Sequence, residues 1–215
     1  PSPTWRAKRA SGERTWRKPY LTAVYPGKEM IAINDIVAAS HFFVARHVRP
    51  GDTVVDATAG NGHDTLFLAK LTGPGGRVHA FDIQKKALAN TRALLEKNGL
   101  EQRVSLHLDS HKNMPVHVSG PVRAIMFNLG YLPGGDQELV TVPDDTVAAL
   151  SGSLGVLAKG GIISVATYSG HQGGSQEEEA VAAWCNGLSP REYTVMKLRV
   201  LNKENNPPML WLIKG

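Results

Sequence analysis

The sequence predicts an α/β fold in which a seven-stranded, mostly parallel sheet carries helices on both faces. Short runs rich in apolar and β-branched residues alternate with segments of helical periodicity, which is typical of a parallel sheet with crossover helices. The two last strand-like runs follow each other directly, so one strand near the C-terminus should be antiparallel. The chain has 215 residues, of which 42% are hydrophobic and 20% charged, as expected for a globular domain with a sizeable core.

The first half of the chain alternates helices and strands. Asn34 is expected to cap the first helix, and Pro50-Gly51-Asp52 turns the chain into the first strand. Gly99 is expected to end the third helix, which carries an apolar face. The predicted elements are, in order, a helix over 33–48, a strand over 53–57, a helix over 63–71, a strand over 77–83 and a helix over 84–98.

The second half continues the alternation until the final strand pair. One helix should have Asp144 and Asp145 in its first turn, where they favour the helix dipole, and Gly160-Gly161 beyond its end. The segment 202–208 between the last two strands is too short for a crossover helix, so they must be antiparallel neighbours. The predicted elements are strands over 103–108 and 122–128, a helix over 143–159, a strand over 162–169, a helix over 176–186, and strands over 193–201 and 209–215. This layout, with one reversed strand, is that of the class I methyltransferase (Rossmann-like) fold, whereas a dinucleotide-binding domain would continue βαβ units.

Charge is distributed unevenly along the chain. The net charge is +5, and residues 1–20 account for it with six basic residues and one acidic residue. The remainder has 18 basic and 18 acidic residues. The segment 1–27 is therefore predicted to be a basic extension. It either contacts phosphates or is a solvated tail or the remnant of an organellar targeting peptide. The chain does not begin with Met, so we expect it to be a fragment or a processed form.

Cysteine content and hydropathy indicate where in the cell the protein is expected to be. Cys185 is the single cysteine, so no intrachain disulfide and no cysteine-based metal site is expected. No apolar run approaches the roughly 20 residues of a membrane helix. We therefore expect an intracellular, soluble protein in the cytoplasm or an organelle, with no membrane partner.

The stretch DATAGNGHDT forms the first predicted strand-to-helix junction. Gly60 and Gly62 permit a tight turn and close approach to a ligand, and the following helix offers free N–H groups. The third glycine of the dinucleotide fingerprint is absent, because His63 follows. Asp56 can organise the loop and face an ammonium group. The predicted cofactor-binding residues of this junction are Asp56, Thr58, Gly60, Asn61, Gly62, Asp64 and Thr65.

Acidic residues end the next two predicted strands. Asp82, followed by Ile83, lies about 20 residues past the glycine loop, where a carboxylate suits the two ribose hydroxyls of a nucleotide. Asp109, with Ser110 and His111, can accept from an adenine amino group. Acid at the ribose and a glycine loop without basic residues disfavour a phosphate-rich cofactor. They indicate S-adenosylmethionine as the cofactor and S-adenosylhomocysteine as its product.

The stretch NLGYLPGGD begins at the tip of the fourth predicted strand. Its spacing matches the Asn-Pro-Pro-Tyr loop of methyltransferases that modify amines, with Leu129 and Gly130 in place of the prolines. Asn128 would border the cofactor and accept from the target amine, and Tyr131 would stack on the base or face the sulfonium. The sequence thus predicts in-line attack of a neutral amine on the methyl group.

The motifs DATAGNGHDT, FNLGYLPGGD, YSGHQGG and NNPP, in this order, resemble the MnmM/YtqB family, which is catalogued among rRNA methylases. The resemblance runs from about Lys28 to the C-terminus, so residues 28–215 are expected to form the methyltransferase domain. It implies methylation of the aminomethyl group of 5-aminomethyl-(2-thio)uridine at wobble position 34 of tRNA, giving the 5-methylaminomethyl form. The anticodon loop would be the RNA partner, and the basic leader would fit a plant organellar member.

Further candidates surround the expected site. His171 is predicted to take the proton of the amine, with desolvation as the alternative. The tentative substrate-binding residues are His41, Asp136, Tyr168 and Asn206. A homodimer or the basic extension could supply phosphate contacts, because the rest of the chain is neutral. Other open functions are methylation of an rRNA base or a small-molecule amine, and a non-catalytic module that binds S-adenosylmethionine or RNA.

Overall fold

The computed structural model describes residues 35–215 apart from 131, 133, 135–140, 171–172 and 205. The predicted extension 1–27 and the predicted cap Asn34 therefore lie outside the described residues. Seven strands form one sheet in the order β3-β2-β1-β4-β5-β7-β6. The strands are β1 Thr53–Asp56, β2 Arg77–Asp82, β3 Val104–Leu108, β4 Val122–Asn128, β5 Leu157–Thr167, β6 Thr194–Arg199 and β7 Met209–Lys214.

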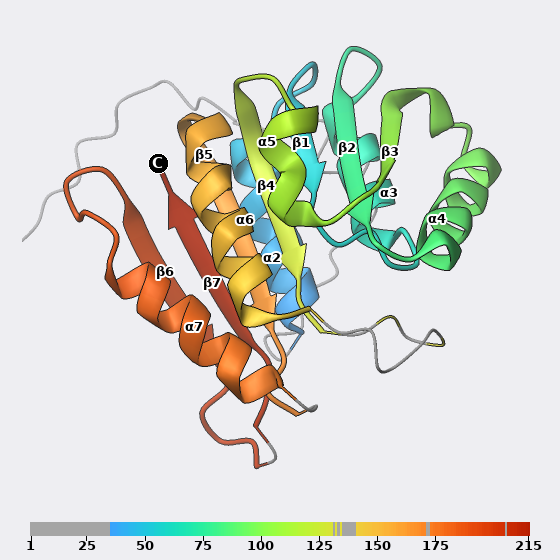
Figure 1. The fold of residues 1–215 in the computed structure, drawn as a ribbon. Helices are drawn as coiled ribbons and strands as arrows, with labels where there is room; N and C mark the ends of the chain where they lie inside the picture. Colours follow the sequence, from blue (N-terminus) through green and yellow to red (C-terminus); the bar gives the residue numbers. More distant parts are fainter. Residues whose placement is uncertain (1–34, 131, 133, 135–140, 171–172, 205) are drawn as a thin grey trace, which may run out of the picture.

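The first five strands are parallel, and β7 runs antiparallel to both β5 and β6. In Figure 1 the arrow of β7 points opposite to that of β4. This arrangement confirms the class I methyltransferase architecture predicted from the two consecutive C-terminal strands. The helices are α2 Ile36–His47, α3 His63–Thr72, α4 Lys85–Lys97, α5 Met114–His117, α6 Pro143–Val156 and α7 Gly174–Asn186, with short 3-10 turns η1 Glu101–Arg103 and η2 His111–Asn113.

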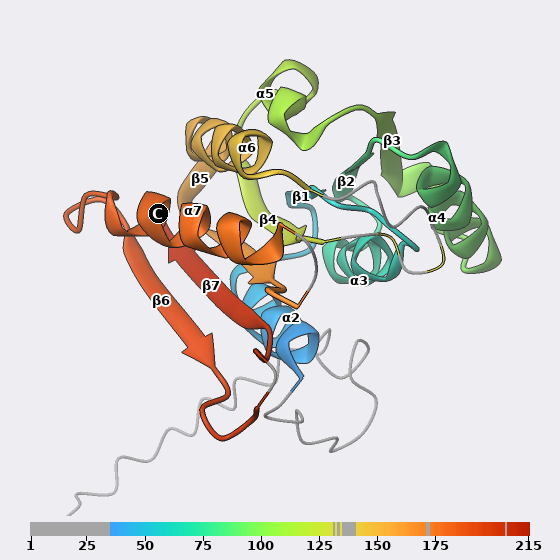
Figure 2. The same ribbon diagram turned by 60° about the horizontal axis from the view of Figure 1, so that its bottom comes forward.

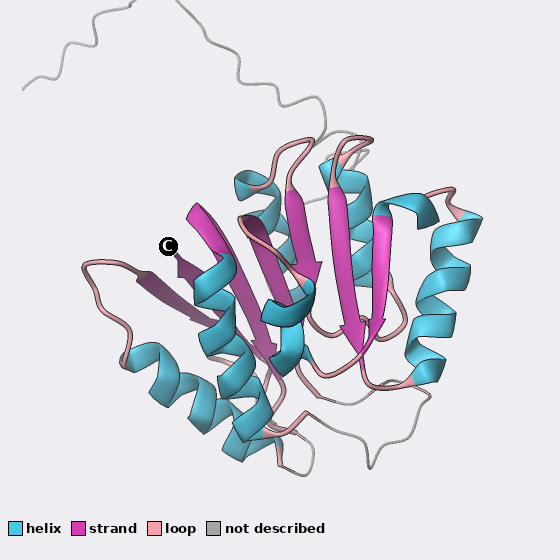
Figure 3. Ribbon diagram, turned by 45° about the horizontal axis from the view of Figure 1, so that its top comes forward, coloured by secondary structure: helices cyan, strands magenta, loops and turns pink. Residues whose placement is uncertain are grey.

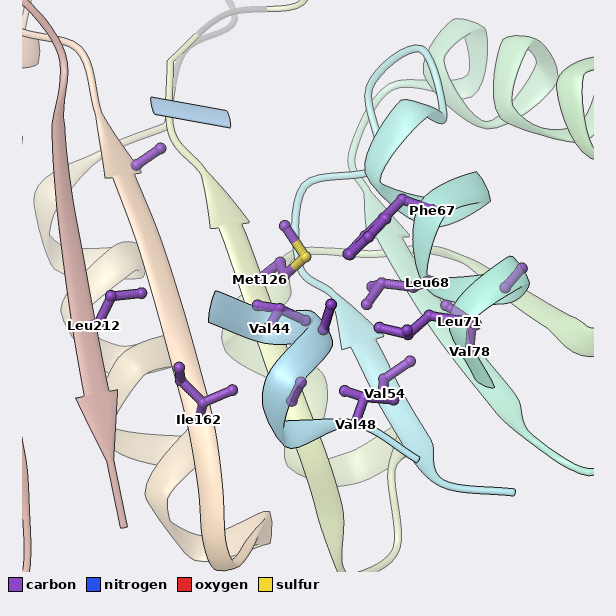
Figure 4. Packing of buried hydrophobic residues seen from close by; sticks show 14 of the residues in the cluster. Val44, Val48, Val54, Phe67, Leu68, Leu71, Val78, Met126, Ile162 and Leu212 are labelled. Atoms are coloured by element: carbon purple, nitrogen blue, oxygen red, sulfur yellow. The ribbon is translucent and has the colours of Figure 1, made fainter. Parts of the chain in front are cut away.

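Helices cover both faces of the sheet (Figures 2 and 3). One apolar core lies under α2, α3 and α4, and Figure 4 shows Val44 of α2 and Leu68 of α3 directed toward the same space over the sheet. The second core lies under α5, α6 and α7 and includes Ile125, Leu150 and Val181. β4 is buried at nearly every position because it faces both cores, which explains its continuous apolar sequence.

Several element boundaries differ from the prediction, among them those of α2, α6 and β5. Asp35, not Asn34, is the N-cap of α2, since its carboxylate accepts from the Ala38 N–H at 3.0 Å. Helix α6 ends at Val156 rather than at residue 159, and β5 begins at Leu157 rather than at 162.

The reason for the earlier start of β5 is a bulge against β4. Leu157 pairs with Val122, whereas Ile162 already pairs with Ala124, so the register shifts between them. Gly161 lies in this bulge, where an added Cβ would sit 2.8 Å from the Ala158 carbonyl oxygen. The two glycines predicted to end a helix therefore belong to an irregular strand.

Besides η1, which precedes β3, two short elements were not predicted, η2 and α5, which follow β3 and pack against α6. Both lie directly after Asp109 and Ser110, so they help to shape the sheet edge where the predicted ligand would bind. Within the described part of the chain, no helix has the length and apolarity needed to span a membrane.

Candidate functional site

A cavity of about 700 Å³ opens at the carboxyl ends of the parallel strands. This is the edge at which ligands bind in sheets of this kind. We call the part around Asp82, Ile83, Asp109 and Ser110 the β2–β3 end. The predicted site residues that line the cavity are Thr58, Gly60, Asn61, Asp64, Asp82, Ile83, Asp109, Ser110, His111, Asn128 and Tyr168.

The glycine loop between β1 and α3 takes a backbone conformation that favours glycine. Gly60 has φ 53° and Gly62 has φ 85°. A Cβ on Gly62 would lie 2.8 Å from the Thr91 Cα, and the Thr91 hydroxyl donates to the Gly60 carbonyl at 3.1 Å. Gly62 is therefore needed to dock the loop on α4, and it is not among the residues that line the cavity.

Asp56 and Thr65 support this loop from below. The Asp56 side chain is fully buried and accepts from the Thr58 N–H at 3.1 Å and from the Thr65 hydroxyl at 2.5 Å. Burial, reinforced by the charge of Asp64, raises the pKa of Asp56 to about 7. Neither residue lines the cavity, so the structure gives Asp56 contacts with the loop rather than with a ligand.

The β2–β3 end presents two carboxylates that already have partners. Asp82 accepts from the Gly60 N–H at 2.9 Å and from the Gln84 N–H at 2.8 Å, and burial raises its pKa. Each carboxylate oxygen has a second lone pair, so these bonds leave acceptor capacity for hydroxyl groups. Ile83 beside it is 55% exposed and offers an apolar surface to the cavity.

Asp109 is fixed by the segment that follows it. Its carboxylate accepts from the Ser110 N–H, from the Asn113 amide and from His117 Nε2, each at 2.8 Å. Hydrogen bonds from His117 and Asn113 lower the pKa of Asp109. His117 and Asn113 were missed in the sequence because they lie on the unpredicted elements η2 and α5.

His111 is buried and its Nδ1 lies 3.3 Å from the Ala57 carbonyl oxygen. A carbonyl can only accept, so Nδ1 carries the proton. Burial lowers the pKa of His111, which keeps the ring neutral at the cavity wall.

We call the opposite part of the cavity, around Asp64, Asn128, Gly130 and Tyr168, the β4 end. The Asn128 N–H donates to the Thr58 hydroxyl at 2.7 Å, and its side-chain Nδ2 lies 3.4 Å from Asp64 Oδ2. A carboxylate can only accept, so the amide nitrogen must face Asp64. The amide oxygen of Asn128 is thereby directed away from that carboxylate.

Asp64 in turn contacts α2. Its Oδ1 lies 2.6 Å from His41 Nε2, and the His41 ring stacks on Phe67 with centroids 3.8 Å apart. His41 is not among the lining residues and reaches the cavity through Asp64. Tyr168 lines the same end, and burial together with the charge of Asp64 raises its pKa to about 12.

The backbone after Asn128 differs from the Asn-Pro-Pro-Tyr loop. Gly130 has φ 139°, and its N–H donates to the Thr141 hydroxyl at 3.0 Å. Proline has no N–H and fixes φ near −65°, so it fits neither requirement. The analogy with that loop therefore does not extend to the backbone at Gly130, and the role of Asn128 stays a prediction.

Glu177 of α7 holds Thr141, the residue whose hydroxyl accepts from the Gly130 N–H. It is 2% exposed and accepts from the Thr141 hydroxyl at 2.7 Å and from the Thr146 hydroxyl at 2.6 Å. The Thr141 N–H also donates to the Gly130 carbonyl at 3.1 Å, so the two ends of the segment between them are joined. Sequence reasoning missed Glu177 because it belongs to an acidic run on a helix, which is typical of a solvated face.

The remaining predicted residues are not brought to the cavity by the described structure. Tyr131, Asp136 and His171 lie outside the described residues. Asn206 is exposed, has φ 47° and is not among the lining residues. Within the described ranges, no group of three or more His, Cys, Asp or Glu residues could hold a metal ion. Lining residues that were not predicted include His63, Gln84, Leu129, Leu132, Thr141, Val142 and Asp145.

Comparison with known proteins adds independent findings. A family model described as "Putative rRNA methylase" matches residues 78–214. The chain is 38% identical over 185 residues to the Arabidopsis thaliana protein named "tRNA (mnm(5)s(2)U34)-methyltransferase, chloroplastic", which covers 81% of this chain and 68% of that protein.

Solved structures agree with this match. A "putative rRNA-methylase" from Clostridium thermocellum is 45% identical, with a TM-score of 0.82, covering 84% of this chain and 97% of that one. A methyltransferase of Streptococcus mutans, solved in complex with SAH, is 36% identical with a TM-score of 0.77 and the same coverage. An rRNA methylase from Streptococcus thermophilus is 35% identical with a TM-score of 0.71, covering 84% and 96%.

Proposed function

Because the chain belongs to the rRNA methylase family defined by this model and is an S-adenosylmethionine-dependent methyltransferase, we propose that it methylates a modified wobble uridine of tRNA. The target is the aminomethyl nitrogen of 5-aminomethyl-(2-thio)uridine at position 34, and the product is the 5-methylaminomethyl form. The name of the Arabidopsis relative supports this choice of nucleoside. The anticodon loop is the part of the tRNA that would enter the cavity.

The β2–β3 end fits the adenosine part of S-adenosylmethionine. Asp82 retains acceptor capacity for the ribose hydroxyls, and Ile83 offers an apolar surface for the adenine ring. Ser110 and His111 line the same region. The glycine loop lacks basic residues, as suits a cofactor without phosphate. When bound, S-adenosylmethionine supplies an electrophilic methyl group on a positively charged sulfur.

The orientation of the Asn128 side chain is the observation that carries the proposal for the amine. Its nitrogen faces Asp64, so its oxygen is the atom that can accept an N–H from a substrate in the cavity. An amine attacks only if its lone pair is aimed at the methyl carbon, and an acceptor on its N–H groups sets that direction. Thr58 fixes the Asn128 backbone, which limits the freedom of this acceptor.

The contact of Glu177 with Thr141 supports the role of Asn128 as the acceptor for the amine. Gly130, Thr141 and Glu177 form a chain of hydrogen bonds that fixes the backbone directly after Asn128. A fixed acceptor loses little entropy when substrate binds, so more of the binding energy is available for orientation. Tyr131 and His171 remain predicted contacts of the uracil and the amine.

The test is mass analysis of nucleosides from tRNA that carries the aminomethyl form, incubated with protein and S-adenosylmethionine. We expect the methylaminomethyl nucleoside with the wild type and about a 100-fold lower rate with Asn128→Ala. Asn202→Ala serves as the matched control, because Asn202 is exposed in the β6–β7 connection. An unchanged rate in Asn128→Ala would refute the role of this side chain. The family description suggests rRNA as another substrate. If methyl groups were transferred to rRNA or to a free amine and none to the tRNA nucleoside, the proposed substrate would be refuted.

A further inference from the structure

A buried carboxylate and a histidine stand behind the acceptor that the proposed function assigns to the amine. Asp64 lines the cavity, and its side chain is only 8% exposed. One of its oxygens lies near the Asn128 amide and the other is bonded to His41. Asp64 therefore connects the β4 end of the cavity with helix α2.

His41 is placed to continue this connection toward solvent. Its ring is held flat against Phe67, and its side chain is 17% exposed, about twice the exposure of Asp64. The helix α2 that carries it is capped at its start by Asp35, so the ring is attached to a fixed backbone. The His41 contact with Asp64 is not a surface ion pair, because both groups are largely shielded from water.

The proposed reaction requires such a group, because an alkylamine is mostly protonated near neutral pH and a protonated amine has no lone pair for attack. Resting on the proposed function, we propose that Asp64 accepts the proton that the substrate ammonium loses, and that His41, acting through Asp64, passes it to solvent. Asp64 is the catalytic residue in this assignment and His41 is a positioning and relay residue.

The step balances. The ammonium N–H bond breaks and its proton moves to the Asp64–His41 pair. The freed lone pair forms the new N–C bond, the S–C bond breaks, and its electron pair stays on sulfur as S-adenosylhomocysteine leaves. The product is a secondary ammonium, and the relay releases one proton to solvent for each methyl group transferred.

The ionisable groups around Asp64 come from several elements. Asp56 lies below it on β1, Tyr168 follows β5, and His63 precedes it on α3 and lines the same cavity. The charge of Asp64 raises the pKa of both Asp56 and Tyr168, which places both groups within its electrostatic reach. With its pKa raised to about 12, Tyr168 is uncharged near neutral pH and offers no competing charge to a substrate ammonium that approaches Asp64.

His41→Gln tests the relay because glutamine can donate to Asp64 through Nε2 but does not titrate. His47→Gln, on the same helix, is the matched control. Single-turnover methyl transfer is measured from pH 6 to 10 on tRNA carrying the aminomethyl nucleoside, and affinity for S-adenosylhomocysteine is measured by calorimetry. In His41→Gln we expect about a 100-fold lower rate at pH 7, recovery toward pH 10 where alkylamines titrate, and affinity within about twofold of wild type.

His41→Ala allows a second measurement, in which no rescue is expected if the role of His41 is purely structural. It leaves a ring-sized space against Phe67, and added imidazole is expected to restore at least about tenfold in rate at pH 7. A wild-type rate and pH profile in His41→Gln would overturn the relay alone, as would losses of affinity that match the losses of rate. A wild type that leaves this nucleoside unmethylated would overturn the proposed function, and the relay with it.

Discussion

The two ends of the cavity hold their carboxylates in different ways. At the β2–β3 end, Asp82 and Asp109 are partly exposed and accept from groups in the segments that follow β1, β2 and β3. At the β4 end, Asp64 and Glu177 are buried and bond side chains from other elements. The β2–β3 end is formed by residues at the strand tips themselves. The β4 end forms only after helices α2, α3, α6 and α7 have packed on the sheet.

This difference suggests that the β2–β3 end determines cofactor affinity, whereas the β4 end orients the substrate. A carboxylate with local partners can take up a cofactor with little effect on the rest of the fold. A buried carboxylate linked to distant elements fixes geometry, and losing it leaves donors without an acceptor. Variants at the two ends should therefore separate cofactor affinity from methyl transfer.

The largest effect is expected for Glu177→Ala. The Thr141 and Thr146 hydroxyls would lose their buried acceptor, so the free energy of unfolding should fall by about 3 kcal/mol. Methyl transfer should fall more than affinity for S-adenosylhomocysteine, because the turn at Gly130 loosens. Chemical denaturation and calorimetry measure the two quantities, with exposed Glu179→Ala as the control. Equal losses in affinity and transfer would break the comparison between the two ends.

Gly130→Ala should have the next largest effect. Alanine at φ 139° is strained, which costs about 2 kcal/mol, and relief of that strain would displace the Gly130 N–H from Thr141. The single-turnover rate should fall while cofactor affinity is retained. Gly155→Ala provides a control, because a Cβ there would meet no atom within 4 Å and this glycine lies inside α6. Wild-type transfer in Gly130→Ala would show that this backbone does not guide the amine.

Asp82→Asn should affect the β2–β3 end of the cavity. The new amide has a single acceptor oxygen, so it can accept from only one of the Gly60 and Gln84 N–H groups. Its NH₂ group would face the other N–H, and two donors repel each other. Affinity for S-adenosylhomocysteine should fall by about 10-fold, equal to about 1.4 kcal/mol, with the single-turnover rate at saturating cofactor little changed. Isothermal titration measures the first quantity. Asp52→Asn, away from the cavity, is the control, and an intact affinity in Asp82→Asn would remove this carboxylate from the cofactor site.

The smallest effect is expected for His117→Gln, on the exposed side of Asp109. The pKa of Asp109 is lowered mainly by the hydrogen bond from His117. A carboxylate whose pKa is lowered in the folded state stabilises the fold above its ordinary pKa near 4, and the contribution is lost as the pH falls further. Thermal unfolding of wild type and variant should therefore differ slightly at pH 6 and converge toward pH 3. A difference that grows on acidification would contradict the stabilising role of this hydrogen bond.

The sequence predicted the β2–β3 end better than the β4 end for a physical reason. Asp82 ends β2, Asp109 directly follows β3, and Gly60 lies in the loop after β1. Parallel strands bring these tips together whatever the helices do. Glu177 contacts Thr141 only because α7 packs beside α6, and no local pattern encodes that contact.

The same reason explains the errors along the chain. The end of α6 depended on the pairing of Leu157 with Val122, a contact between residues far apart in sequence. His41 was predicted to reach the substrate, but its position behind Asp64 follows from how α2 crosses the sheet. The sequence comparison matched Gly130 to a proline position. Its φ and the hydrogen bond from its N–H to Thr141, which exclude proline there, are visible only in the folded chain.

The strand order of the last hairpin has a consequence for how the chain folds during synthesis. β6 precedes β7 in the chain, yet in the described sheet it pairs with β7 alone, while β7 pairs with both β5 and β6. On the ribosome, β6 would emerge without a partner, and it can join the sheet only once β7 has followed. Until then the edge of β5 is open and α7 lacks part of its support. The nascent protein thus passes through a stage with an unpaired strand edge, which is where we expect chaperones to bind and aggregation to begin.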